Sequence, residues 1–132
     1  MHKERPENKS RVRLGQFLPN MVFTILKDKS DKNNPVSVSD ITNIIYDLGI
    51  ISEDGEDKNR TVRRCLQDLV GLSKALYDLT DTGIYARITL GNWNGRIVEI
   101  SNKKNNRFQY YFEPFSDEER KELLSMPLMG GL

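Results

Sequence analysis

The sequence predicts an α+β domain in which the helices come first and the strands follow. Up to about residue 70, apolar residues recur every three or four positions, which is the period of a helix. From residue 84 they alternate with polar ones, which is the period of a strand, and Asn94-Gly95 favours a tight turn. At 132 residues the chain is long enough for one domain with a single core.

The composition is that of a polar chain, with 30% charged and 37% hydrophobic residues. No apolar run approaches the roughly 20 residues that a membrane-spanning helix needs, and the N-terminus lacks the apolar core of a secretory signal. We therefore expect no membrane association and a cytoplasmic location. The single cysteine, Cys65, excludes an internal disulfide and fits that reducing compartment.

The net charge of +1 conceals a segregated distribution. Residues 1–13 carry five basic side chains against two acidic ones, and residues 57–64 carry four against one. A third basic cluster lies at residues 103–107, whereas residues 113–122 carry five acidic side chains against two basic ones. This pattern permits a basic surface that faces DNA and an acidic surface opposite to it.

The N-terminal part predicts an arm and two helices. Residues 1–13 are expected to form a flexible basic arm, which either lies along phosphates or has no function. A first core helix is expected over residues 14–26, regular from near Leu18 because Pro19 fits a first turn. The pattern Ser37-Val38-Ser39-Asp40 is a capping box, so it predicts a second helix, which Gly49 would end.

The third helix is expected over residues 57–70, with Asp57 as its N-cap. Its apolar stripe consists of Val62, Leu66, Leu69 and Val70. In the first turns of this helix, the sides that lie off the apolar stripe carry polar and basic residues. Whether the helix continues past Gly71 is left open by the sequence.

The second half predicts three strands in a meander, at residues 84–90, 96–100 and 107–112. A short acidic helix follows over residues 116–125, with Leu123 and Leu124 facing inward. Three helices followed by such a meander is the order of a winged helix-turn-helix, here over residues 14–115. Residues 116–132 would then be a linker or a dimer contact.

The leading end of the third helix is the candidate DNA site, because Arg can pair with guanine, and Asn or Gln with adenine, in the major groove. The candidate residues there are Lys58, Asn59, Arg60, Thr61, Arg63, Arg64 and Gln67. The preferred wing tip adds Lys103, Lys104 and Arg107, and the tip at residues 92–96 is the other option. The alternatives are a solvated amphipathic helix and lysines that keep a hairpin soluble.

The sequence lacks the residues that catalysis or metal binding would need. The one histidine, His2, lies in the arm, and Cys65 lies beside the apolar stripe of the third helix, where a core role is expected. No glycine-rich phosphate loop is present. We therefore expect no enzymatic activity, no metal and no cofactor.

Three segments carry a resemblance to a known family. They are residues 34–41 (NPVSVSDI), residues 60–69 (RTVRRCLQDL) and residues 110–119 (YYFEPFSDEE). Together they resemble the N-terminal winged helix-turn-helix part of bacterial transcriptional regulators that carry a WYL domain. Cys65 departs from the family pattern, which has an acidic residue after the paired arginines.

The resemblance implies a homodimer that binds double-stranded DNA through Arg60, Thr61, Arg63 and Arg64. The ligand-sensing domain of such regulators would lie beyond Leu132, so the chain is expected to be either an excised DNA-binding half or a small stand-alone relative. A small-molecule or nucleotide effector is expected only if such a domain exists.

Two other binding functions are compatible with the sequence. A protein-interaction module would use exposed aromatic anchors, for which Tyr85, Trp93 and Tyr111 are candidates. Trp93 either docks on a partner or folds back on the sheet. A binder of single-stranded nucleic acid would stack bases on Tyr110 and Tyr111, although a core role for both is favoured.

Overall fold

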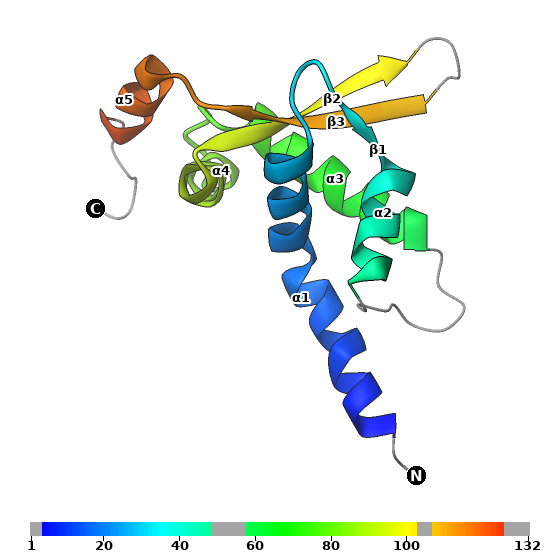
Figure 1. The fold of residues 1–132 in the computed structure, drawn as a ribbon. Coiled ribbons are helices and arrows are strands. Elements are labelled where there is room, and N and C mark those ends of the chain that lie inside the picture. The colour runs from blue at the N-terminus through cyan, green and yellow to red at the C-terminus, as the bar shows by residue number, and fades with distance from the viewer. Residues whose placement is uncertain (1–3, 49–57, 103–106, 126–132) are drawn as a thin grey trace.

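The computed structural model describes the backbone of residues 4–48, 58–102 and 107–125 (Figure 1), and the side chains of residues 17–48, 59–101 and 107–125. This part of the chain has an α+β fold with five helices and a three-stranded antiparallel sheet. The hairpin of residues 95–102 and 107–114 follows the first helices, as expected, but one predicted strand is a helix and a short strand lies between the first two helices. The element order is compatible with a winged-helix layout. Among the described residues, no helix combines the length and apolar character needed to cross a membrane.

Helix α1 spans Glu4–Lys29, so it begins before the residue-14 start that the sequence predicted. The backbone of residues 4–13, expected to be an irregular arm, is helical. Pro19 lies inside the helix rather than in its first turn. Proline removes a backbone hydrogen bond and crowds the preceding turn. In agreement, Figure 1 shows that α1 changes direction along its length.

The predicted second helix is confirmed as α2, Val38–Asp47. The Ser37 hydroxyl accepts from the backbone N–H of Asp40, and the Asp40 carboxylate accepts from the N–H of Ser37, so the capping box is complete. Gly49, its expected end, lies outside the described residues. The short strand β1, Val36–Ser37, precedes α2 and was not predicted.

The third helix is confirmed as α3, Lys58–Lys74, and it continues through Gly71. Its apolar stripe is buried as expected, with Leu66 fully inaccessible. Asp57, the expected N-cap, lies outside the described residues. The Ser73 hydroxyl donates to the Leu69 carbonyl (3.0 Å) and accepts from the N–H of Ile97 (3.3 Å), which fixes the end of α3 on the sheet.

The predicted strand at residues 84–90 is wrong, because Asp81–Trp93 form helix α4. Thr80 caps it by accepting from the N–H of Gly83. The buried positions are Gly83, Ala86, Arg87 and Leu90, which follow helical spacing. Ile88, which belonged to the alternating pattern, is 53% exposed. The buried side of the helix includes Gly83 and Arg87, so a count of apolar residues alone does not reveal its helical spacing.

The Asn94-Gly95 hairpin turn is also wrong. Asn94 ends α4 in the left-handed conformation, with φ 59° and ψ 34°. Gly95 begins strand β2, Gly95–Asn102, where a side chain would run into the Phe112 ring and the Glu113 carbonyl. Residues 92–94 therefore end α4 and residues 95–96 begin β2, so this segment is not a wing tip.

The sheet has the strand order β1-β3-β2, in which β3 spans Arg107–Pro114. The hairpin of β2 and β3 was predicted, and its register pairs Ile97 with Phe112. The third strand is β1, which pairs Val36 with Tyr110, and so the expected meander of three consecutive strands is wrong. Residues 103–106, which join β2 to β3, lie outside the described residues.

Aromatic side chains hold the helical layer on the sheet. Phe23 is fully buried on α1 and stacks on Trp93 at a ring-centroid distance of 4.9 Å. It also meets the edge of Phe112 at 6.5 Å. Trp93 thus folds back into the body of the protein, which was one of its two expected placements. The Ser30 hydroxyl, accepting from the N–H of Phe112 at 3.0 Å, adds a polar link between α1 and β3.

The predicted C-terminal helix is confirmed as α5, Asp117–Ser125. Ser116 and Glu119 exchange the two hydrogen bonds of a capping box before it (3.0 and 3.1 Å). Leu123 packs against the core, as expected. Leu124 is 86% exposed, so its expected inward orientation is wrong.

Cys65 is a core residue, as predicted, and burial raises the pKa of its thiol to about 12, with a further contribution from Asp68. We expect its alkylation by iodoacetamide to be slow in the folded protein and fast in denaturant, because only the thiolate reacts. Fast alkylation of the folded protein would contradict the placement.

The raised pKa of the Cys65 thiol also predicts an effect of pH on stability. The thiol ionises more readily in the unfolded chain than in the folded one. Its contribution to the free energy of unfolding is therefore present below pH 9.0 and is lost as the pH rises toward 12.

Candidate nucleic-acid interface

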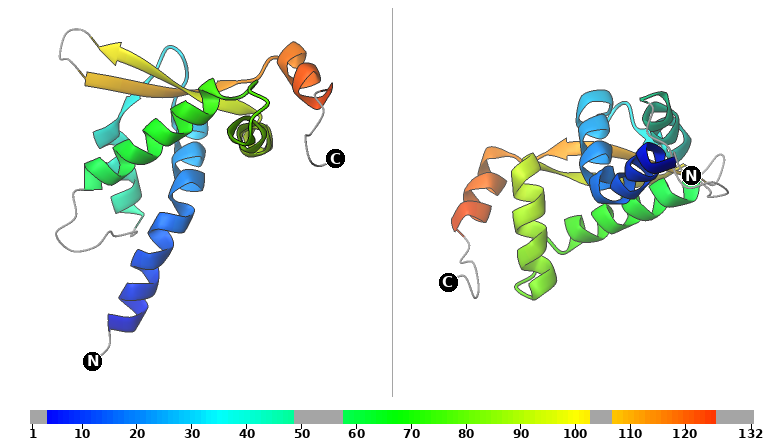
Figure 2. Two further views of the ribbon diagram at one scale, coloured as in Figure 1. Left: turned by 180° about the vertical axis from the view of Figure 1, so that it is seen from behind. Right: turned by 90° about the horizontal axis from the view of Figure 1, so that it is seen from below.

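The outward side of α3 carries most of the candidate residues. Arg60, Arg63, Arg64 and Gln67 are all exposed, whereas Val62 and Leu66 on the opposite side are buried. Over its whole length the helix has five basic side chains and one acidic one. Seen from behind, α3 lies in front of α1 and the sheet (Figure 2, left).

One groove beside α3 brings three of the candidates together. It runs between the start of α2, the start of α3 and the end of the β2–β3 hairpin where β3 begins. Its lining consists of Ser37, Val38, Ser39, Asn59, Arg63, Arg107, Phe108 and Tyr110. Asn59 and Arg63 from the helix thus share a groove with Arg107 from the hairpin. This is the arrangement that a helix and an adjacent wing would need to contact one ligand.

A polar pair lies at the same groove. The Tyr110 hydroxyl donates to the Glu99 carboxylate at 2.8 Å. Burial and this carboxylate raise the pKa of Tyr110, while the positive charge of Arg63 opposes the rise. Arg63 therefore lies close enough to act electrostatically on the hydroxyl that lines the groove.

Three further candidates lie on the other flank of α3. Thr61, Arg64 and Gln67 line a second groove, together with residues of α1 and α4. Its other lining residues are Leu18, Pro19, Cys65, Asp68, Leu69, Gly71, Leu72, Thr82, Tyr85 and Thr89. The structure thus divides the candidate set between two flanks, and the exposed side of the helix with Arg60 lies between them.

Three candidate residues are not placed. Lys103 and Lys104 lie outside the described residues, and only the backbone of Lys58 is described. Arg107 is exposed at the start of β3. The end of the hairpin that leads toward residues 103–106 lies on the same side of the molecule as the N-terminal end of α3 (Figures 1 and 2). The lysine contacts of the tip stay a prediction.

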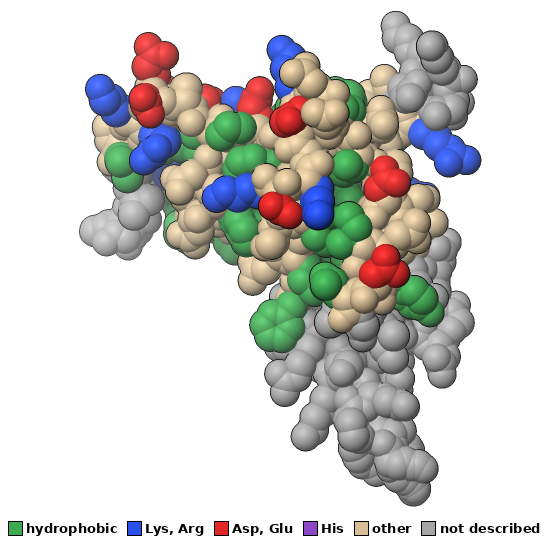
Figure 3. All heavy atoms as spheres, in the orientation of Figure 1, with side chains coloured by type: hydrophobic (Ala, Val, Ile, Leu, Met, Phe, Trp, Pro, Cys, Tyr) green, Lys and Arg blue, Asp and Glu red, His purple; other side chains and the backbone are tan. Residues whose placement is uncertain are grey.

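The acidic segment lies away from this side. Helix α5 has four acidic side chains and two basic ones, and it follows the opposite end of the β2–β3 hairpin (Figure 1). On the face shown in Figure 3, acidic and basic side chains are interspersed. Neither sign forms a continuous patch on that face.

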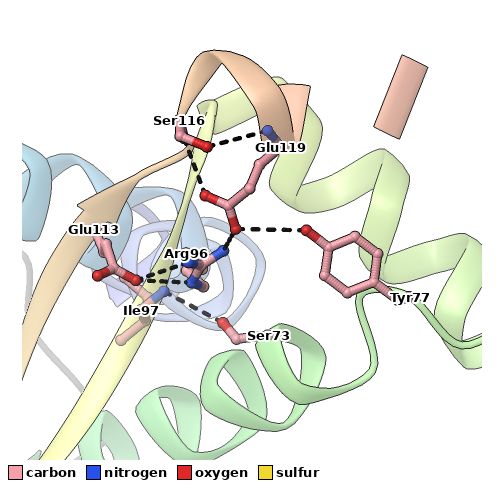
Figure 4. A network of polar contacts seen from close by, with 7 residues as sticks. All are labelled: Ser73, Tyr77, Arg96, Ile97, Glu113, Ser116 and Glu119. Atoms are coloured by element: carbon pink, nitrogen blue, oxygen red, sulfur yellow. Dashed lines mark hydrogen bonds and ion pairs between the residues drawn. The ribbon is translucent and has the colours of Figure 1, made fainter. Parts of the chain in front are cut away.

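A network around Arg96 fixes α5 to the rest of the fold (Figure 4). Its guanidinium contacts Glu119 through Nη1 (2.7 Å) and Glu113 through Nη2 (2.9 Å). The Tyr77 hydroxyl, after the end of α3, donates to Glu119 at 3.5 Å. The hydrogen bond from Arg96 is the main cause of the lowered pKa of Glu119. For Arg96, burial lowers the pKa, but the hydrogen bonds and charges of Glu119 and Glu113 together outweigh it and the pKa is raised.

Sequence reasoning missed several residues of the first groove. The serines at positions 37 and 39 enter it because β1 brings the start of α2 beside β3. Phe108 has the same alternation in β3 as Tyr110 and Phe112, which are buried, but it is 51% exposed. Phe108 pairs with Ser101 of β2. On the other side of β3, β1 pairs only with Gln109 and Tyr110, so no residue of β1 is paired with Phe108. No signal in the sequence marks that boundary.

Two of the aromatic candidates for other functions are buried. Tyr110 is 1% exposed and Tyr111 is 7% exposed, so neither can serve as a stacking platform for bases. Trp93 stacks on Phe23. Of the proposed protein-binding anchors, Tyr85 alone is well exposed, at 60%.

Comparison with family models, with curated proteins and with solved structures finds no match to this chain. A function for it is therefore argued from the exposed side of α3 and from the two grooves that flank this helix.

Proposed function

We propose that this chain is a winged helix-turn-helix protein that binds double-stranded DNA sequence-specifically and regulates transcription, in keeping with its resemblance to the WYL-domain regulators. The observation that carries the proposal is the exposed stripe of Arg60, Arg63, Arg64 and Gln67 on a helix whose other side is buried. A helix of about 10–12 Å diameter fits the major groove, which is about 12 Å wide.

In this function α3 enters the major groove, and its first two turns together with Gln67 in the third contact the base edges. Guanidinium groups donate two hydrogen bonds to a guanine, and the Gln67 amide pairs with an adenine. Arg107 and the adjoining hairpin tip contact the phosphate backbone as the wing. The Ser73 hydrogen bonds and the buried stripe hold α3 rigidly, so these side chains are presented in a fixed register.

The test begins with selection from a random duplex library by the purified chain, followed by anisotropy titrations over a range of salt concentrations. The triple variant R60Q/R63Q/R64Q should bind the selected duplex at least about 100-fold more weakly, since each base contact contributes about 1–3 kcal/mol. The slope of log affinity against log salt concentration should also become shallower. Replacing an arginine that contacts a phosphate should reduce that slope by about 0.9.

The control is K32Q/R120Q/K121Q, which removes the same formal charge from exposed positions outside α3. It should bind like the unmodified chain. The proposal fails if the unmodified chain has no salt-dependent affinity for any duplex in the library, or if both triple variants lose affinity equally.

A further inference from the structure

Phe108 is an exposed aromatic residue in the first groove, whose lining is largely polar. Its side chain shares one face of β3 with those of Tyr110 and Phe112, because alternate residues of a strand point to the same side. That face packs on helices, since Phe112 meets Phe23 of α1. Tyr110 and Phe112 are buried, whereas Phe108 is 51% exposed. The apolar face of β3 therefore extends beyond the helices that cover it and ends as an exposed ring beside α3.

The surroundings of this ring favour nucleic acid as its partner. Arg63 and Arg107 line the groove with Phe108, and the Asn59 amide lies among them. Among the described residues, no acidic side chain lines the groove. The Glu99 carboxylate, which reaches the groove only through Tyr110, accepts a hydrogen bond from that hydroxyl at 2.8 Å. A ligand that fits this groove must offer hydrogen-bonding or anionic groups together with an apolar group.

We infer that Phe108 is a specificity-determining residue, which recognises a thymine by packing its ring on the C5-methyl group. The inference rests on the proposed function. Of the groups that the bases present in the major groove, the thymine methyl is the apolar one, and a Phe side chain is suited to contact it. Asn59 and Arg63 share the groove with the ring and lie in the first two turns of α3, which contact base edges in this function. The thymine therefore lies at or beside a base pair that one of these two side chains contacts.

An exposed ring on a DNA-binding surface has two other possible contacts. It can pack on a deoxyribose, which carries no sequence information, or wedge between base steps from the minor groove. The shared groove with Asn59 and Arg63 favours the major groove, because these side chains project from the helix that enters it. Uracil separates the alternatives, since it keeps the hydrogen-bonding groups of thymine and lacks only the methyl.

The experiment first locates the thymine. The full chain and its Phe108→Ala variant each select from the same random duplex library. The two consensus sequences should differ at one position, where the unmodified chain selects thymine and the variant does not. Identical consensus sequences would overturn the inference.

Affinities are then measured by anisotropy for the selected duplex and for a copy with deoxyuridine at that position. The unmodified chain should bind the uracil duplex about fourfold more weakly, the factor that corresponds to the burial of one methyl-sized apolar group. Phe108→Ala should bind the two duplexes equally, because the group that contacts the methyl is gone. A variant that keeps the fourfold preference would overturn the inference.

Phe17→Ala is the matched control, because it removes the same ring from a 46% exposed position of α1 that does not line the groove. It should keep the full preference for thymine over uracil. Circular dichroism verifies that each variant is folded, and the comparison of the two duplexes with the unmodified chain needs no variant. Duplex binding by the unmodified chain without discrimination between thymine and uracil would overturn the inference and leave the proposed function standing. A chain that binds no duplex would contradict both.

Discussion

Phe23→Ala is expected to lower the free energy of unfolding by about 3–5 kcal/mol. Phe23 is fully buried, and its ring contacts Trp93 at the end of α4 and Phe112 of β3. Truncation leaves a cavity between α1, α4 and the sheet, which these rigid elements cannot close. Since domains of this size are stable by about 5–15 kcal/mol, the variant would lose a large part of its stability.

Urea denaturation, followed by the fluorescence of Trp93, measures this effect directly. Phe17→Ala is the matched control, because the same residue type on the same helix is 46% exposed there. Its effect should stay within about 0.5 kcal/mol, as for most surface substitutions. Equal losses in the two variants would show that Phe23 is not at the centre of the packing.

Arg96→Met is expected to lower the free energy of unfolding by about 1–3 kcal/mol, a range that allows for hydrogen bonds to charged groups and for partial screening by solvent. The side chain of Arg96 is 23% exposed and those of Glu113 and Glu119 are 38% and 26% exposed. Methionine keeps most of the stem but leaves two carboxylates near each other without their shared cation.

The same variant should change the pH dependence of stability. The pKa of Glu119 is lower in the folded protein than its ordinary value of 4.5, so its contribution is present above pH 4.5 and is lost as pH falls through the folded pKa. Thermal unfolding at neutral and acidic pH should therefore show a smaller acid loss for Arg96→Met than for the unmodified chain. Arg120→Met, on the exposed side of α5, should retain the full acid loss. An unchanged profile in Arg96→Met would exclude the network as its source.

Local signals predicted some elements well and others poorly. The capping box at Ser37 and the one at Ser116 placed α2 and α5, because capping depends only on neighbouring residues. Strand β1 has two residues and exists only because β3 pairs with it, so no local pattern marks it. Helix α4 was mistaken for a strand because its stripe contains Gly83 and the buried Arg87, which a count of apolar residues excludes.

The candidate site was predictable as a set of residue types but not as an arrangement. The basic leading end of α3 is visible in the sequence, and the structure confirms that Arg60, Arg63, Arg64 and Gln67 are exposed. The separation of Arg63 from Arg64 onto two flanks follows from what packs beside the helix. The packing beside α3 depends on contacts between residues that are distant in sequence, and a single sequence does not reveal such contacts.

The central position of β3 determines when this fold can be completed during synthesis. β3 pairs with β1 and with β2, and Val36 is matched to Tyr110 across most of the chain. A nascent chain that ends before residue 107 therefore contains α3 and β2, including the Ile97 N–H that binds Ser73, but it lacks the strand with which both β1 and β2 pair. Such long-range pairing slows folding, because loop closure precedes the contacts that compensate for it. We expect that a nascent chain forms its basic helix early and completes its sheet only after its last strand, β3, has emerged from the ribosome.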